Sequence, residues 1–198
     1  MTRRGAYAKG IAKREEILTT ALEVVAAHGY RRASVRELAD AVGLSAAGLL
    51  HYFDSKEELF TAILRKRDER DQEAYGADGG IDMLLTVIRH NATVPGLVQL
   101  YAQLAVEAVD PEHPAHAFFR ERTQGLQEHF RTAVVRAQEN GEIRDDLDPA
   151  WVATSVQALA DGLQSLWLVN PDVDMAAHIE QFLDALRPAP QPQGGAAS

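Results

Sequence analysis

The sequence predicts an all-α protein with a three-helix helix-turn-helix domain at the N-terminus and a helical body after it. Apolar residues recur at helical spacing through most of the chain, and no stretch alternates apolar and polar residues as a half-buried strand would. Three candidate helix-capping serines, Ser34, Ser45 and Ser55, follow one another closely. All eight prolines lie at or after Pro95, where they separate the helices of the body.

The amino-acid composition argues against a disulfide-bonded, membrane-spanning or secreted protein. The 198 residues are 46% hydrophobic, which is enough for one good core or two small ones. There is no cysteine, no apolar run approaches the length of a membrane span, and no apolar segment follows Arg3 and Arg4 as it would in a secretory signal. We therefore expect no disulfide, no membrane partner and a cytoplasmic location.

The charge is unevenly distributed along the chain. The net charge is −9, yet residues 1–56 hold nine Lys and Arg against six Asp and Glu, a net of +3 that leaves −12 for the remainder. Residues 1–14 carry five of these cations and no acid. A basic head on an acidic body favours phosphate contacts at one end, although such a basic run can also be a solvated tail without a partner.

The first helix is expected over residues 9–28, after a loose start at residues 1–8. Leu18 and Val25 belong to its apolar stripe, and Gly29 ends it as the residue after the C-cap.

A second helix begins at Val35, because Ser34 and Glu37 spell a capping box. Gly43 then supplies the positive φ that a tight turn between helices needs. Ser45 follows as the N-cap of another short helix.

That short helix is expected over Ala46–Tyr52, and Ser55 with Glu58 forms a capping box that opens a longer one. Helices of about two turns are not stable alone, so tertiary packing must hold them. Small residues beside the glycine turn allow a close crossing, which favours a helix-turn-helix over an ordinary αα-hairpin.

A family resemblance rests on this region. The motif comprises Ala39, Gly43-Leu44-Ser45, Leu49-Leu50, Phe53 and Ser55-Lys56-Glu57-Glu58-Leu59. It resembles the DNA-binding domain of the tetracycline-repressor (TetR) family, and the later part of the chain resembles the subgroup with a BetI-type C-terminal region.

The resemblance implies a set of positions that contact DNA: Arg36, Ser45, Ala46, Ala47, Gly48, His51, Tyr52 and Lys56. With alanine and glycine at the start of the recognition helix, close backbone approach and contact with thymine methyl groups are the available chemistry. Lys56 combines a cation with the free N–H groups of a helix N-terminus, which suits a phosphate. Tyr52 could instead serve in the core beside Phe53.

The helix from Lys56 to about residue 74 is expected to connect the head, residues 1–56, to the body, residues 75–187. Its charged run, RKRDERDQE, is interpreted as a solvated face. The body is expected to contain helices over about 81–93, 95–109, 115–139, 149–169 and 175–186, and residues 188–198 to form a disordered tail.

The resemblance also implies a small-molecule site in the body and a dimer formed by the last two long helices. Candidate pocket residues are Met83, Tyr101, Phe118, Phe119, Phe130, Trp151 and Trp167, although aromatic residues at helical spacing are more often plain core. Candidate dimer residues are Val156, Leu159, Leu163, Leu166, Ile179, Phe182 and Leu183, which could alternatively be buried within one subunit.

The sequence contains little that indicates a metal site or an enzyme active site. His113 and His116 have a spacing that could share a metal, but Pro114 separates them and a capping or surface role is favoured. No nucleophile–base pair, metal-ligand spacing or phosphate loop is present, so we expect no cofactor.

The resulting hypothesis is a homodimeric, ligand-responsive repressor of a palindromic DNA operator, with an unknown small-molecule effector. The alternatives are a helical enzyme or small-molecule carrier, and a regulator with a degenerate head that acts through protein partners.

Overall fold

The computed structural model describes residues 2–29, 33–76 and 80–189, and within these ranges every regular element is an α-helix. The all-α prediction is confirmed, and no helix in these ranges combines the length and apolar character needed to span a bilayer. The helices are α1 (Thr2–His28), α2 (Val35–Ala41), α3 (Ala46–Leu50), α4 (Lys56–Tyr75), α5 (Ile81–Asn91), α6 (Pro95–Glu107), α7 (His116–Glu139), α8 (Pro149–Val169) and α9 (Met175–Ala185).

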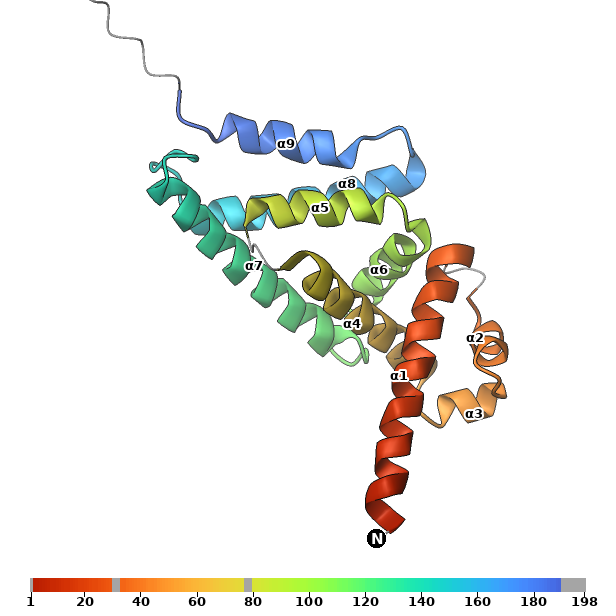
Figure 1. Ribbon diagram of the computed structural model, residues 1–198. Coiled ribbons are helices and arrows are strands. Elements are labelled where there is room, and N and C mark those ends of the chain that lie inside the picture. The colour runs from red at the N-terminus through yellow and green to blue at the C-terminus, as the bar shows by residue number, and fades with distance from the viewer. Residues whose placement is uncertain (1, 30–32, 77–79, 190–198) are drawn as a thin grey trace, which may run out of the picture.

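Two groups of helices divide the molecule. In Figure 1 α1, α2 and α3 form one end, α5, α8 and α9 lie toward the other, and α4 runs between the two groups with α7 alongside. Helix α4 contacts α1 as well as α5 and α6, while α8 contacts α6, α7 and α9. A single helix therefore begins in the N-terminal group and ends inside the body.

Helix α1 is longer than predicted. It begins at Thr2, so the expectation of a loose segment over residues 1–8 is wrong for the described part of that segment. The sequence from Thr2 to Gly10 contains no proline, and helix-favouring alanine, arginine and lysine predominate, so nothing stops the helix from extending. In Figure 1 these first turns project beyond the other helices.

The two ends of the molecule have separate hydrophobic cores. The first joins α1 to α4 with one face of α6 and includes Ile17, Leu49 and Phe60, while the second joins α5 and α7 to α9 and includes Val152 and Ile179. The packing of α6 against the first core ties the N-terminal helices to the body.

Gly96 makes this junction possible. A Cβ atom at Gly96 would lie 2.1 Å from the carbonyl oxygen of Val25 and 2.7 Å from Cα of Gly29. Only glycine allows the start of α6 to approach the end of α1 this closely, because both obstructing atoms belong to backbone. Gly29 itself has φ of +82° and ends α1 as predicted.

The predicted tail lies mostly outside the described residues, which end at residue 189. The predicted caps of the body helices are confirmed where they are described. Asp148 Oδ1 accepts from Ala150 N–H and Asp174 Oδ1 from Ala177 N–H, and Gly141 has φ of +73° after α7.

Candidate functional site

The helix-turn-helix is held by the predicted caps. Ser34 Oγ accepts a hydrogen bond from Glu37 N–H at 3.2 Å, and Ser34 N–H donates to the Glu37 carboxylate at 3.2 Å. Gly43 has φ of +68°, and Leu44 N–H donates to the carbonyl oxygen of Ala39 at 2.9 Å. These contacts fix the direction in which the chain leaves α2 and enters α3.

Helix α3 is shorter than predicted, ending at Leu50 instead of Tyr52. Ser45 Oγ caps its start by accepting from Gly48 N–H at 3.0 Å. Beyond Leu50, Tyr52 N–H donates to the carbonyl of Leu49, three residues back, so the last turn tightens and the α-helix stops.

The next cap differs in detail from a capping box. Ser55 Oγ accepts from Glu58 N–H at 3.0 Å, as predicted. The Glu58 carboxylate, however, accepts from Asp54 N–H and not from Ser55 N–H. The side chain reaches one residue further back, which still provides the backbone before α4 with an acceptor.

The predicted DNA-contacting residues of the head are all at least partly accessible. Arg36, Ser45, Ala46, Ala47, His51 and Lys56 are exposed, and Gly48 and Tyr52 are half-buried. Four apolar residues of the same region are buried, with Leu38, Ala39, Leu49 and Phe53 between 0 and 3% exposed. Tyr52 packs against the first core, in agreement with the alternative of a core role, and its ring meets that of His51.

Two basic residues of the N-terminal region contact other residues of the head. The Arg14 guanidinium lies 4.8 Å from the ring centroid of Phe53 and 3.6 Å from the Glu58 carboxylate. Lys13 Nζ donates to Glu16 at 2.8 Å and to the carbonyl of Val42 at 3.4 Å. Both cations hold α1 against the motif, a role that a count of charge along the sequence does not reveal.

A cavity of about 400 Å³ lies in the body, between α4, α5, α7 and α8. Its apolar wall includes Met83, Leu84, Val87, Leu126 and Phe130. Its polar wall is contributed by Arg67, Asp68, Asp71, Asn91, Tyr101, Arg122, His129, Gln157, Asp161 and Gln164. An apolar chamber with a polar end is the usual form of a small-molecule site.

Three of the predicted pocket residues line this cavity: Met83, Tyr101 and Phe130. The other four do not. Phe118 and Phe119 pack in and against the first core, Trp167 is buried in the second core, and Trp151 is 51% exposed. Helical spacing places an aromatic side chain on a face, but which face meets the cavity depends on how the helices cross.

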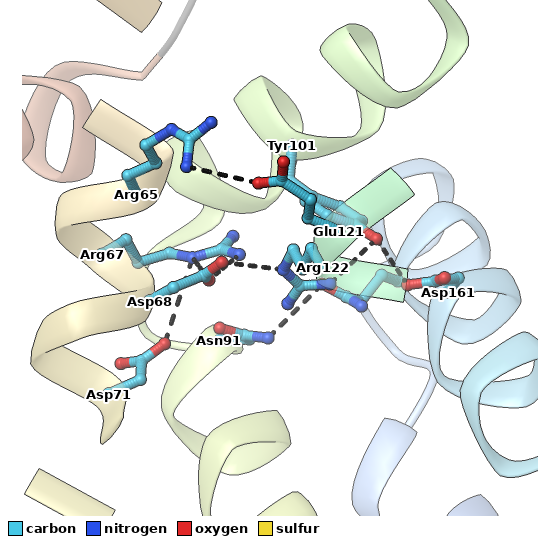
Figure 2. Close-up of polar contacts among 10 residues, drawn as sticks. Arg65, Arg67, Asp68, Asp71, Asn91, Tyr101, Glu121, Arg122 and Asp161 are labelled. Carbon is cyan, nitrogen blue, oxygen red and sulfur yellow. Dashed lines mark hydrogen bonds and ion pairs between the residues drawn. The ribbon is translucent and has the colours of Figure 1, made fainter. Parts of the chain in front are cut away.

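Part of the polar wall forms a connected network (Figure 2). Asp68 of α4 accepts from Arg67 Nη2 at 2.7 Å and from Arg122 Nε at 2.8 Å, so it joins α4 to α7. Arg122 Nη1 donates to the Tyr101 hydroxyl at 3.3 Å, and that hydroxyl donates to Asp161 Oδ1 of α8 at 3.1 Å. The network therefore links α4, α6, α7 and α8.

The interpretation of the RKRDERDQE run as a solvated face is wrong at its centre. Arg67 is only 5% exposed, and the side chains of Asp68 and Asp71 are 29% and 13% exposed. Both guanidinium groups, those of Arg67 and Arg122, lie about 5 Å from the Tyr101 ring centroid. These partners come from distant helices, so the sequence of α4 alone carries no signal for the burial.

Burial and pairing move the pKa values of these groups in different directions. Burial opposes ionisation of Asp68, but Arg67 and Arg122 outweigh it and the pKa lies below 3.8. Burial raises the pKa of Asp71 and of Asp161 above 3.8, because their cationic neighbours compensate only in part. Burial also raises the pKa of Tyr101 to about 12, so its hydroxyl remains a donor.

Family models match both parts of the chain. Residues 17–63 match the model described as bacterial regulatory proteins of the tetR family, and residues 83–188 match the BetI-type transcriptional repressor C-terminal model. The second match alone spans more than half of the chain. The chain belongs to the TetR family.

Curated relatives agree with the TetR assignment. The chain is 30% identical to the transcriptional repressor AcnR of Corynebacterium diphtheriae over 176 residues, covering 87% of this chain and 88% of the relative. It is 26% identical to the transcriptional regulator TcmR of Streptomyces glaucescens, covering 88% of this chain and 83% of that protein.

Solved TetR-family structures share the fold. A putative TetR-family regulator from a Rhodococcus species superposes with a TM-score of 0.68 at 26% identity, covering 89% of this chain and 98% of that chain. A TetR regulator from Chloroflexus aurantiacus gives 0.67 at 25% identity, covering 90% and 95%. The protein is thus a DNA-binding transcriptional repressor of the TetR family and not an enzyme.

The predicted dimer residues of this TetR protein fall into a buried group and a more exposed group. Val156, Leu163 and Ile179 are 0 to 5% exposed and belong to the core of the single chain. Leu159, Phe182 and Leu183 are half-buried, and Leu166 is 59% exposed. Val169, one turn after Leu166 on α8, is 87% exposed although the sequence analysis did not select it.

The two histidines considered as metal ligands have local partners. His113 Nδ1 accepts from Ala115 N–H at 3.2 Å, and its Nε2 lies 3.6 Å from the Glu107 carboxylate. His116 Nδ1 lies 2.9 Å from the carbonyl oxygen of Ala108. Both imidazoles therefore contact groups in and beside the turn before α7, and the described residues contain no group of three or more metal-ligating side chains.

Proposed function

We propose that the protein is a homodimeric repressor that binds a palindromic operator and responds to a small molecule held in the body cavity. One observation carries the ligand response. Helix α4 begins at Lys56 in the head and, three turns later, supplies Arg67, Asp68 and Asp71 to the cavity wall. A molecule in the cavity would contact the same rigid element that sets the position of the head.

The Asp68–Arg122 pair would couple the two sites. It is the contact through which α4 is fastened to α7 at the polar wall, with an N–O distance of 2.8 Å. A ligand that altered this pair would change the angle of α4, and hence the spacing of two heads in a dimer. Heads that read adjacent major grooves must lie about one helical turn of DNA apart, so a small rotation is enough to weaken binding.

DNA contact would be made by the exposed surface of α2, α3 and the start of α4. Arg36 and Lys56 supply the charge, while Ser45, Ala46 and Ala47 stand at the N-terminal end of the recognition helix. The dimer would form through α8 and α9, where Leu166 and Val169 are exposed apolar residues. Burying exposed apolar area is the main driving force for such association.

The direct test is selection of binding sites from a genomic DNA pool with the purified protein at stated salt. The proposal predicts recovery of a palindrome, bound by the native protein and bound much more weakly by Arg36→Ala and Lys56→Ala. Arg131→Ala, which removes an equal charge from the exposed face of α7, is the control. Recovery of no specific sequence by a folded dimer would contradict the proposal.

A further inference from the structure

Several hydrogen-bond donors of the cavity's polar wall are engaged within the wall itself, whereas His129 Nε2 is buried without a partner among the described residues. Arg67 Nε and Nη2 both donate to Asp68, and Arg122 donates through Nε to Asp68 and through Nη1 to Tyr101. The Tyr101 hydroxyl donates to Asp161. The Asn91 amide donates to Gln164 at 3.4 Å. A ligand that sought these arginine and tyrosine donors would have to break existing charge-assisted bonds.

Several acceptors of the wall have no donor among the described residues. Gln157 is 8% exposed, and its Oε1 atom is buried without a hydrogen-bond partner among the described residues. Within the described part of the chain, Asp161 accepts a side-chain hydrogen bond only through Oδ1, from Tyr101. Asp71 accepts no hydrogen bond from the described residues, and its nearest cation, Arg67 Nε, lies 4.0 Å away. Burying an acceptor without a donor costs free energy. A ligand that donates hydrogen bonds to these atoms would remove that cost.

The charges of the wall do not balance. Two arginines stand against Asp68, Asp71 and Asp161, which leaves one negative charge when all three are ionised. Asp68 is paired with both arginines, so the excess lies on Asp71 and Asp161. The raised pKa of each of these two carboxyls agrees with incomplete compensation by the arginines.

Two of the free acceptors stand together on α8. Gln157 and Asp161 are four residues apart and both line the cavity, so they are neighbours on one helix face. The opposite part of the chamber is apolar, with Met83, Leu84 and Phe130 among its lining residues. The cavity therefore offers a short polar clamp for one group and an apolar chamber for the rest of a ligand.

We propose that the cavity binds a protonated amine with an apolar body, its ammonium N–H groups donating to Gln157 Oε1 and to the Asp161 carboxylate. The inference rests on the proposed function in that it names the chemical class of the effector. A carboxylate or phosphate ligand would add negative charge where negative charge is already in excess. A quaternary ammonium would satisfy the charge but has no N–H group for Gln157.

The test uses four probes that share one phenylbutyl body and differ only in the head group. They are 4-phenylbutylamine, trimethyl-(4-phenylbutyl)ammonium, 4-phenylbutanol and 4-phenylbutyrate. Binding to the full-length protein is measured by isothermal titration calorimetry at neutral pH without DNA. The amine is expected to bind roughly tenfold or more tightly than each of the others, the factor associated with one charge-assisted hydrogen bond.

Variants of the clamp locate the binding site. Gln157→Leu and Asp161→Asn are each expected to weaken the amine roughly tenfold while leaving the weak binding of the alcohol unchanged. Asp172→Asn removes an equal charge from an exposed position outside the cavity and should bind the amine as the native protein does. Circular dichroism melting confirms that each variant is folded.

Tighter binding of the butyrate than of the amine, or amine affinity that survives both clamp variants, would overturn the inference. So would equal binding of the amine and the quaternary ammonium. Operator affinity is measured separately with and without the amine. An amine that binds through Gln157 and Asp161 but leaves operator affinity unchanged would support this inference while contradicting the proposed ligand response.

Discussion

Asp68 and Asp71 lie one turn apart on α4, yet their environments give them opposite effects on stability. Asp68 accepts from two arginines, and these lower its pKa despite burial. Asp71 is buried and its ion pair with Arg67 Nε is long, at 4.0 Å, so burial raises its pKa. The charge of Asp68 is favourable in the folded protein, whereas the charge of Asp71 is unfavourable.

Asp68→Asn should destabilise the protein by about 3 kcal/mol at pH 7, because it leaves Arg67 and Arg122 without their shared carboxylate. Since the folded pKa of Asp68 lies below 3.8, its contribution is present above that value and is lost as the pH falls through the folded pKa. Urea unfolding measures the change. Glu121→Gln, in an exposed pair with Arg65, should have little effect, and equal effects of the two variants would contradict the account.

Asp71→Asn should instead stabilise the protein at pH 7, by about 1 kcal/mol. A carboxyl whose folded pKa is raised takes up a proton in the folded state first, so its penalty is largest above the raised pKa and vanishes below about 3.8. Urea unfolding of native and variant protein at pH 7 and at acidic pH should show the advantage shrinking as the pH falls. Destabilisation at pH 7 would mean that Asp71 is paired.

The role of a single residue could be predicted from the sequence where that role depends only on neighbours along the chain. The caps at Ser34, Ser45 and Ser55 and the turn at Gly43 depend on neighbours within a few positions, and all four were identified. Burial of Arg67 could not be predicted, because its partner Tyr101 belongs to another helix and no local pattern records that contact.

At the scale of elements, the close approach of α6 to the end of α1 depends on the absence of a side chain at Gly96. Gly96→Ala should destabilise the protein by about 2 kcal/mol, since the added methyl group meets the backbone of Val25 and Gly29, which cannot move without separating the helices. Gly125→Ala is the matched control within α7, where a Cβ has no atom within 4 Å. It should stabilise the protein by about 0.5 to 1 kcal/mol through helix propensity.

Thermal and urea unfolding distinguish the two glycine variants. Equal stability of Gly96→Ala and the native protein would show that α1 and α6 are not held as closely as described.

The helices themselves were predicted to within a few residues, because hydrophobic period, caps and prolines all act along the chain. The differences at α1 and α3 have different physical causes. The start of α1 at Thr2 reflects helix propensity in a segment without an apolar stripe to signal it. The early end of α3 at Leu50 reflects a tightened last turn that sequence pattern does not encode.

At the scale of the whole molecule, the family, the N-terminal head and the helical body could be predicted from the sequence. The residues that form the cavity could not. Its walls come from helices far apart in sequence, so three of seven predicted pocket residues line it while its charged members were missed. The same limit applies to the dimer surface. Val156 and Ile179 fit the apolar pattern equally well but are already covered within one chain.

The proposed dimer predicts that Leu166→Asp, which places a charge on the exposed face of α8, gives a monomer with much weaker operator binding. Val106→Asp is the matched control, because Val106 is an apolar residue, 73% exposed, near the end of α6, which is not one of the two helices of the proposed interface. Sedimentation equilibrium measures the oligomeric state. A Leu166→Asp protein that remained dimeric would place the interface elsewhere.

The central claim is that the cavity and the head communicate through α4, held by Arg122. The most direct measurement is the operator Kd of Arg122→Met compared with Arg131→Met, an equal loss of charge on the exposed face of the same helix. The account predicts that Arg122→Met binds operator at least about fivefold more weakly, because without the Arg122–Asp68 pair the position of α4 is less ordered before the heads bind. Equal affinity of the two variants would contradict it.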